Sequence, residues 1–287
     1  MNEVVASDLS SGPCLSSGKG HKDENFPVAS WLVRPDARAP IMAYYRFARA
    51  ADDIADHPTA APQDRLARLA AMRAGLTGSG APVAMELAAI ARARGIDLVH
   101  AHDLLDAFVQ DVTVHRTADW AALIAYCRMS AMPVGRFVLD VHGEDRALWP
   151  LSDALCAALQ IVNHLQDCGK DYRAIDRVYL PGDLMNIAGV PVGALGEAQS
   201  SPALRGVIRD CAGRTLELLR QSATFAAAIK DARLAAEVAI IQRLAVDLAQ
   251  GLTRRDPLSE NTHHSRPRAA WLAVAAVLRL GAQRLRA

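Results

Sequence analysis

Helical segments separated by short stretches of glycine, proline and serine are the feature that most limits the possible folds of this chain. Apolar residues in these segments recur every three or four positions, and alternating runs typical of strands are few. Ala, Leu and Arg, which favour helices, dominate the composition. Because neither a strand-helix alternation nor a fixed repeat is present, we predict an all-α fold built as a single helical domain. The expected helices are residues 38–56, 63–75, 82–94, 99–114, 118–142, 152–174, 202–228, 230–251 and 267–285.

Charge, cysteine spacing and the two ends of the chain argue against several classes of protein. A formal net charge of +1 gives no reason to expect a nucleic acid partner. The 5 cysteines form no CxxC pair, which argues against a disulfide framework or structural zinc and fits a reducing cytoplasm. Residues 1–22 do not have the pattern of a signal peptide, and their composition predicts a disordered tail before a domain of residues 23–287. The longest late apolar run, 269–278, is about half of a bilayer span, so no transmembrane helix is expected.

The segment 159–171 carries a polar stripe along one side of an expected helix. Its members are Gln160, Asn163, Asp167 and Asp171. At about 100° per residue they fall within about 80° of one another on the helix wheel. The other faces carry Leu159, Ile161 and Leu165, which is the pattern of a helix buried on most sides.

The expected helix 38–56 repeats this arrangement near its end. The stripe there consists of Tyr45, Arg49, Asp52 and Asp56, with Asp53 to one side. Because these residues lie within about 60° of one another, two helices each present carboxylates four residues apart. Like charges at that spacing destabilise an isolated helix by roughly 0.2–0.5 kcal/mol, which favours a compensating cation. Carboxylates prefer hard metals, and Mg²⁺ completes its shell with waters and substrate phosphates.

An alternative is that both stripes are ordinary solvated helix faces, on which single DxxD or DxxxD patterns are common. Two such stripes, each with a side chain suited to phosphate or water such as Arg49 or Asn163, are harder to explain in that way. A di-iron bundle would need Glu-x-x-His on two helices, and only residues 260–263 fit, in a proline-bounded loop. The pair of stripes therefore favours a magnesium site.

Three stretches resemble the squalene/phytoene synthase family. They are ARAADDIAD (48–56), YCRMSAMPVG (126–135) and LQIVNHLQDCGKDYRAIDRVYLP (159–181). Within that family, NHLQDCGKDYRAIDRVYLP (163–181) and ENFPVASWLV (24–33) are similar to the bacterial hopanoid-pathway branch, hydroxysqualene synthase. The resemblance runs from about residue 24 to the C-terminus.

The resemblance implies an isoprenoid synthase fold with a central cavity, in which two or three Mg²⁺ ions bridge two Asp-rich helices to a prenyl diphosphate. The implied metal ligands are Asp52, Asp53, Asp56, Asp167 and Asp171. The residues expected at the substrate are Asn25, Phe26, Tyr45, Arg49, Gln160, Asn163, Arg177 and Tyr179, and those expected in catalysis are Tyr126 and Arg49. For the aromatic residues Phe26, Tyr45 and Tyr126, ordinary core packing is an equal alternative.

Several positions depart from the family pattern. Gln166 and Lys170 stand where much of the family has Arg and Glu in the second motif. Asp176 occupies a place where Gly often precedes the flap arginine, and Asn25 stands where related enzymes have a phosphate-binding Ser. These changes alter the local charge, so the number of metal ions does not transfer directly from the family.

The implied reaction is Mg²⁺-dependent ionisation of presqualene diphosphate and capture of the cation by water, which makes the chain a carbon-oxygen lyase of squalene and hopanoid biosynthesis. Quenching by water rather than hydride implies that NADPH is not needed. Two alternatives stay open: condensation of two prenyl diphosphates, as by presqualene diphosphate, squalene or phytoene synthases, and a non-catalytic protein that binds prenyl lipids or a partner enzyme.

We expect a cytoplasmic protein whose C-terminal segment has two interpretations. Residues 271–287 are consistent with an amphipathic helix resting on the inner membrane face, with Arg279, Arg284 and Arg286 on its polar side. They are also consistent with an ordinary packed terminal helix.

Overall fold

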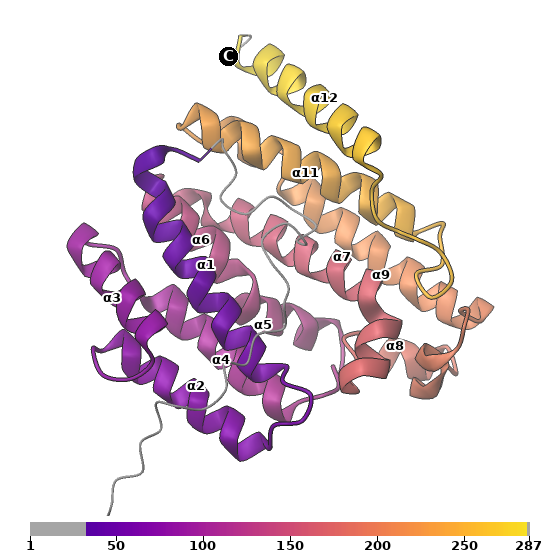
Figure 1. The fold of residues 1–287 in the computed structure, drawn as a ribbon. Helices are drawn as coiled ribbons and strands as arrows, with labels where there is room; N and C mark the ends of the chain where they lie inside the picture. The colour runs from indigo at the N-terminus through magenta and orange to yellow at the C-terminus, as the bar shows by residue number, and fades with distance from the viewer. Residues whose placement is uncertain (1–32, 286–287) are drawn as a thin grey trace, which may run out of the picture.

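The computed structural model describes residues 33–285, and the regular elements in that range are helices, which confirms the predicted all-α class (Figure 1). The α-helices are α1 (Pro35–Ala55), α2 (Pro62–Leu76), α3 (Pro82–Arg94), α4 (Val99–Thr113), α5 (Trp120–Ser130), α6 (Met132–His142), α7 (Trp149–Ile175), α8 (Gly182–Ile187), α9 (Pro202–Gln221), α10 (Phe225–Ala228), α11 (Ala232–Leu252) and α12 (Arg266–Arg284). Two short 3₁₀-helices are η1 (Arg146–Leu148) and η2 (Val192–Gly196). The expected tail and the candidate residues Asn25 and Phe26 lie outside the described residues.

Proline and glycine mark where many of these helices begin and end. Proline lies in the first turn of α1, α2, α3, α6, α7, α9 and α12, where its missing N–H removes no intrahelical bond. Gly95 and Gly143 follow α3 and α6 with φ of 64° and 68°, a left-handed conformation that glycine adopts without strain. The prolines and glycines that separate the helical segments in the sequence therefore mark where helices begin and end.

The boundaries differ from the prediction in three places. The expected helix 118–142 is two helices, α5 and α6, because Pro133 supplies no N–H and its ring collides with the carbonyl four residues earlier. The expected helix 202–228 divides into α9 and α10 at a turn that begins at Ser222. The segment 181–202, predicted as loop, contains the short helix α8.

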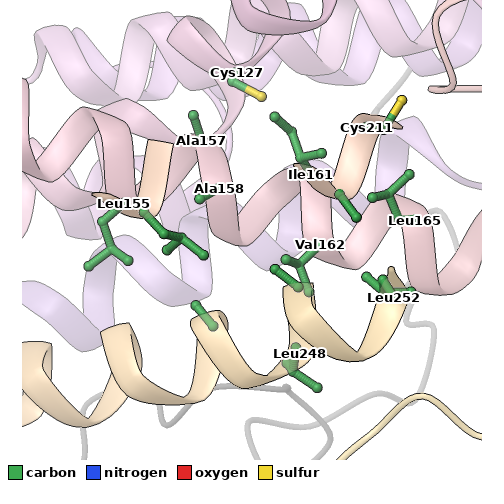
Figure 2. Close-up of a cluster of buried hydrophobic side chains, with 14 of the residues drawn as sticks. Cys127, Leu155, Ala157, Ala158, Ile161, Val162, Leu165, Cys211, Leu248 and Leu252 are labelled. Carbon is green, nitrogen blue, oxygen red and sulfur yellow. The ribbon is translucent and has the colours of Figure 1, made fainter. Parts of the chain in front are cut away.

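Helix α7 lies in the middle of the fold and packs against α5, α6, α9 and α11 (Figure 1). Its side chains Val162 and Leu165 are buried on the side that faces Leu248 and Leu252 of α11, and Ile161 is buried on the opposite side (Figure 2). Burial of these apolar side chains stabilises the packing of α7 against its neighbours and fixes the position of the helix. The polar residues of α7 are therefore held on a rigid element.

A second buried cluster joins α1, α2, α3 and α4. Phe47 of α1 is fully buried in it, together with Leu87 of α3 and Leu105 of α4. Tyr44 of α1 stacks on Phe137 of α6 with ring centroids 4.1 Å apart, so α6 connects this cluster to the one around α7. Packing on both sides thus fixes α1 relative to α7.

One stretch of the described residues, Trp120–His142, has the length and hydropathy of a membrane-spanning helix. It covers α5 and α6, whose side chains Leu123, Cys127, Phe137 and Leu139 are buried in the protein core. Burial of this kind is typical of core helices, and we interpret the stretch in that way.

The central position of α7 predicts a large stability difference between two matched substitutions. Val162→Ala removes two methyl groups from a fully buried site, whereas Val274→Ala removes the same atoms from a valine that is 61% exposed on α12. We expect Val162→Ala to lower the free energy of unfolding by about 2 kcal/mol more than Val274→Ala does in urea denaturation. Equal effects would contradict the packing described here.

Candidate active site

A cavity of about 510 Å³ lies among α1, α4, α5, α6, α7, α10 and α11. Its polar end is lined by residues at the C-terminal ends of α1 and α7 and in the segment after α7: Asp52, Asp56, Asp171, Arg177 and Tyr179. Its other end is lined mainly by apolar side chains of α1, α6 and α11: Ile41, Val138, Leu139, Leu234, Val238 and Ile241, with the buried Glu237 beside them. From Ile41 to Asp56 the cavity wall follows α1 for about 22 Å. The cavity is therefore long and polar at one end.

The carboxylates of α1 lie at the negative end of the helix dipole. Asp52 and Asp53 belong to the last turns of α1, Asp56 caps it, and the last turn holds no basic residue. Arg49 partly offsets this charge, with its guanidinium 2.7 Å from Asp52 Oδ2 and 3.0 Å from Asp53 Oδ1. Burial raises the pKa of Asp52 above its ordinary value, the Asp56 carboxylate raises it further, and Arg49 opposes both. A cation at this position would relieve the repulsion.

The carboxylates of α7 occupy a similar position near the end of their helix. Burial raises the pKa of Asp171 to about 6, and the neighbouring Asp167 carboxylate is the next cause. Lys170 Nζ lies 3.8 Å from Asp167 Oδ2 and opposes this shift. The charge of Asp56 on α1 also raises the pKa of Asp171. The carboxylates of the two helices therefore repel one another across the same end of the cavity.

Arg177 connects α1 to α4 at the polar end. Its Nη1 donates to Asp56 Oδ1 at 2.7 Å, and its Nη2 donates to the backbone carbonyl of Asp111 at 3.0 Å. The Arg177 side chain is 6% exposed, whereas that of Asp56 is 38% exposed, so the charge of Arg177 is buried while its carboxylate partner reaches solvent. Arg177 thus presents a fixed positive charge beside the α1 carboxylates.

The turn after α7 sets the position of Arg177. Asp176 ends the helix with φ of 51°, in the left-handed region where glycine is favoured and Asp is tolerated. Its carboxylate is 2.5 Å from Arg116, and Val178 N donates to the His115 carbonyl at 2.9 Å. This pairing aligns 177–180 along the segment after α4, and the positive φ of Asp176 lets the chain turn into it.

Two residues that the sequence interpretation missed complete the polar end. Asp111 of α4 is 4% exposed and accepts hydrogen bonds from Tyr126 at 2.8 Å and from Tyr179 at 3.4 Å. Burial raises the pKa of Asp111 to about 6, against the opposing charge of Arg177. An available signal was the position of Asp111 seven residues after Leu104 and three after Phe108, on an otherwise apolar helix face.

The second missed residue is His164 of α7, which lines the cavity. Its ring stacks on Tyr179 with centroids 3.4 Å apart. Burial lowers the pKa of His164 to about 3, with a smaller effect from the Arg177 charge, so the imidazole is neutral near pH 7. Its Nε2 makes no hydrogen bond to the described residues. A buried histidine on a helix wall is not distinguishable by spacing from ordinary core packing, so no sequence pattern pointed to His164.

Most of the predicted site residues within the described range line this one cavity. Those that do are Tyr45, Arg49, Asp52, Asp56, Tyr126, Gln160, Asp171, Arg177 and Tyr179. Asp53, Asn163 and Asp167 are not among the lining residues, and Asp53 is held by Arg49 on the neighbouring side of α1. The assigned roles of all of these residues stay predictions.

The donor set fits Mg²⁺ bound together with a phosphate-bearing substrate. Within residues 33–285, no group of three or more His, Cys, Asp or Glu side chains is close enough to enclose a metal ion. Mg²⁺ does not need such a cage, because it commonly takes one or two carboxylates and fills its shell with phosphate oxygens and waters. Asp52, Asp56 and Asp171 supply hard oxygen donors whose mutual repulsion a divalent ion would offset.

Several known proteins are similar to this chain in sequence and fold. The sequence profile of the family described as squalene/phytoene synthase matches residues 19–275. Hydroxysqualene synthase of Zymomonas mobilis is 54% identical, with 93% of this chain and 91% of the relative covered, and that of Rhodopseudomonas palustris is 52% identical, with 89% and 88% covered. Presqualene diphosphate synthase of the same Zymomonas strain is 31% identical, with 69% of each covered. The crystal structure of a squalene synthase from Alicyclobacillus acidocaldarius is similar, with a TM-score of 0.70, 27% identity, and 79% of this chain and 87% of that chain covered.

The raised pKa of Asp111 predicts a pH dependence of stability. The pKa of the Asp111 carboxyl is about 6 in the folded protein and ordinarily 3.8. Between these pH values the folded protein therefore keeps a proton on Asp111 that the unfolded chain has lost. The stabilising contribution is complete below about pH 4 and is lost as the pH rises through about 6. Asp111→Asn should therefore lose less unfolding free energy over this interval than the wild type, by up to about 3 kcal/mol in urea denaturation.

A matched control for this pH prediction is Asp210→Asn on α9. Asp210 is 48% exposed and pairs with Arg214, so this variant should keep the pH dependence of the wild type. The assignment to Asp111 is wrong if Asp111→Asn and the wild type show the same slope.

Proposed function

Because the chain belongs to the squalene/phytoene synthase family, we propose that it ionises presqualene diphosphate and captures the cation with water, giving hydroxysqualene and diphosphate. The observation that carries this proposal is one cavity with carboxylates and arginines at one end and an apolar wall along the rest. Such a cavity suits a substrate with a charged diphosphate and a C30 hydrocarbon. Identity of 52–54% to hydroxysqualene synthases, against 31% to a presqualene diphosphate synthase, supports this reaction over condensation.

Mg²⁺ is the cofactor that we propose for this reaction. Asp52, Asp56 and Asp171 would hold it from the cavity wall, with Asp53 and Asp167 as further ligands or supports. When bound, the ion would neutralise charge on the diphosphate and make it a better leaving group.

The two arginines that line the cavity, Arg49 and Arg177, act on the same leaving group. In the structure, Arg49 pairs with Asp52 and Arg177 pairs with Asp56. Each guanidinium group has several N–H donors at the polar end of the cavity. Diphosphate oxygens would accept from these donors while the carboxylates turn to the metal. Preorganised donors of this kind stabilise the charge that grows as the carbon-oxygen bond breaks. The bonding electron pair leaves with the diphosphate.

The remaining wall protects the cation that is left behind. Tyr126 and Tyr179 are held in place by their hydrogen bonds to Asp111, and the neutral His164 stacks against Tyr179. None of these three groups adds a positive charge beside the cation, and the aromatic faces favour it. Water then forms the new carbon-oxygen bond and releases a proton, so no hydride donor such as NADPH is required.

A non-catalytic prenyl-lipid binder is the alternative from another class. Carboxylates with raised pKa values at the ends of two helices cost stability in a protein that never binds a cation there. Their presence therefore favours the enzyme. We place this carbon-oxygen lyase in the cytoplasm, as the cysteine pattern suggests.

The proposed reaction predicts a specific product. Purified protein given presqualene diphosphate and Mg²⁺ without NADPH should release a C30 alcohol, identified by mass spectrometry, with one diphosphate for each alcohol. Turnover of farnesyl diphosphate alone would instead identify a condensing synthase. Formation of a hydrocarbon only when NADPH is added would identify a reductive synthase.

The acidic end of the cavity predicts opposite effects on activity and stability. Asp52→Asn and Asp171→Asn should each lower kcat by about 100-fold or more, because each weakens charge stabilisation at the leaving group. Each variant should be at least as stable as the wild type without Mg²⁺, since a repelling charge is removed.

The exposed Asp210→Asn is the control for these two variants and should keep activity within about twofold, since a surface pair contributes little. Wild-type turnover in both Asp52→Asn and Asp171→Asn would rule out the metal role.

A further inference from the structure

Helix α12 carries an unusual share of the exposed apolar surface. Half of the exposed large hydrophobic side chains in the described residues lie on it or at its C-cap: Trp271, Val274, Val277, Leu278 and Leu285. We call these five residues the α12 stripe. The exposed fractions of Trp271, Leu278 and Leu285 are 59%, 69% and 90%. Scattered single hydrophobic residues are normal on a surface, but a row on one helix indicates a contact.

The α12 stripe lies apart from the side by which the helix joins the protein. At about 100° per residue, its members occupy a sector of about 120° on the helix wheel. The buried residues Leu272, Ala276 and Leu280 occupy a separate sector, through which α12 packs on α11. α12 also lies at the outer edge of the fold, with α11 between it and α7 (Figure 1). One side of α12 thus belongs to the core and another is available to a partner.

Arginines border the α12 stripe on both sides. On the same wheel, Arg268 and Arg279 lie about 60–80° beyond Trp271, and Arg266 and Arg284 lie about 20° beyond Val277. Helix α12 contains no Asp or Glu. Arg268 is paired with Asp247, Arg284 donates to the backbone carbonyls of Ala226 and Ile229, and Arg266 and Arg279 are exposed. Arg279 and Arg284 therefore lie on opposite sides of the stripe rather than on one polar side, as expected from the sequence, and Arg286 lies outside the described residues.

Charge selects among the possible partners. A second copy of the chain meeting this stripe about a twofold axis would bring arginines against arginines, with no acidic side chain of α12 between them. An anionic lipid surface offers the complementary charge, and arginine stems reach past apolar surface to place guanidinium groups among phosphates. The pattern of apolar residues with flanking arginines is typical of helices that lie in a membrane interface.

We propose that the α12 stripe docks this chain on the surface of an anionic lipid bilayer, with α12 parallel to the membrane and its apolar residues among the acyl chains. This inference is independent of the reaction proposed above, since it uses only α12. The α5 and α6 pair stays in the protein core, so the membrane contact is peripheral.

Vesicle flotation with the full chain tests this proposal. The vesicles are phosphatidylcholine alone, or phosphatidylcholine with about 30 mol% phosphatidylglycerol, a content at which flanking arginines should add clear attraction. The stripe variant is Trp271→Ser with Leu278→Ser, and Arg279→Gln tests the charge. The control Ile187→Ser changes an 83% exposed side chain on α8. Turnover in detergent is measured in parallel, so failure of membrane binding is separable from failure of the reaction.

We expect the wild type to partition into anionic vesicles and the stripe variant to bind at least about tenfold more weakly, because each removed side chain contributes apolar burial. Arg279→Gln should reduce binding by a few-fold, roughly the effect of one interfacial charge, and Ile187→Ser should bind normally. The proposal is wrong if the wild type does not float with anionic vesicles. It is equally wrong if the stripe variant binds vesicles normally but loses a dimer in sedimentation or unfolds at a lower temperature, since the stripe would then be a protein contact.

Discussion

Repulsion among carboxylates at the ends of two helices is the constraint on which the rest of this structure depends. The C-terminal ends of α1 and α7 already carry negative partial charge, and Asp52, Asp56 and Asp171 add to it. Arg49 and Arg177 balance part of that charge. Isolated helices would avoid this arrangement. Packing around α7 and α1 holds them together, so the fold maintains a site that would gain stability from a bound divalent ion, as we propose.

Polarity changes along the cavity in the order that the chemistry needs. The charged end would hold the leaving group, and the apolar end would accommodate hydrocarbon and exclude water. Between the two ends, Asp111 fixes Tyr126 and Tyr179 by accepting hydrogen bonds from their hydroxyl groups, while the imidazole of His164 stays neutral. A cation formed there would meet the tyrosine rings and the neutral His164, and the positive charge of Arg177 is partly offset by Asp56 and Asp111. The α12 stripe lies on a different part of the molecule, so docking and chemistry use separate surfaces.

Local patterns in the sequence predicted the helices and much of the site. The stripes that contain Asp52 and Asp171 were visible because helix periodicity places residues on one face, and the structure brings those two faces to one cavity. Asp111 was missed because its partners, Tyr126 and Tyr179, come from distant segments. The break between α5 and α6 was missed because apolar periodicity continues across Pro133, although the helix cannot.

The central claim is that carboxylates of α1 and α7 act together on one diphosphate through divalent cations. Calorimetric binding of inorganic pyrophosphate to the wild type, Asp52→Asn, Asp171→Asn and the double variant, with and without Mg²⁺, tests it most directly. We expect binding to require Mg²⁺, and the double variant to lose clearly less affinity than the two single losses added together, because the carboxylates share one ligand. Strictly additive losses, or equal affinity without Mg²⁺, would contradict the account.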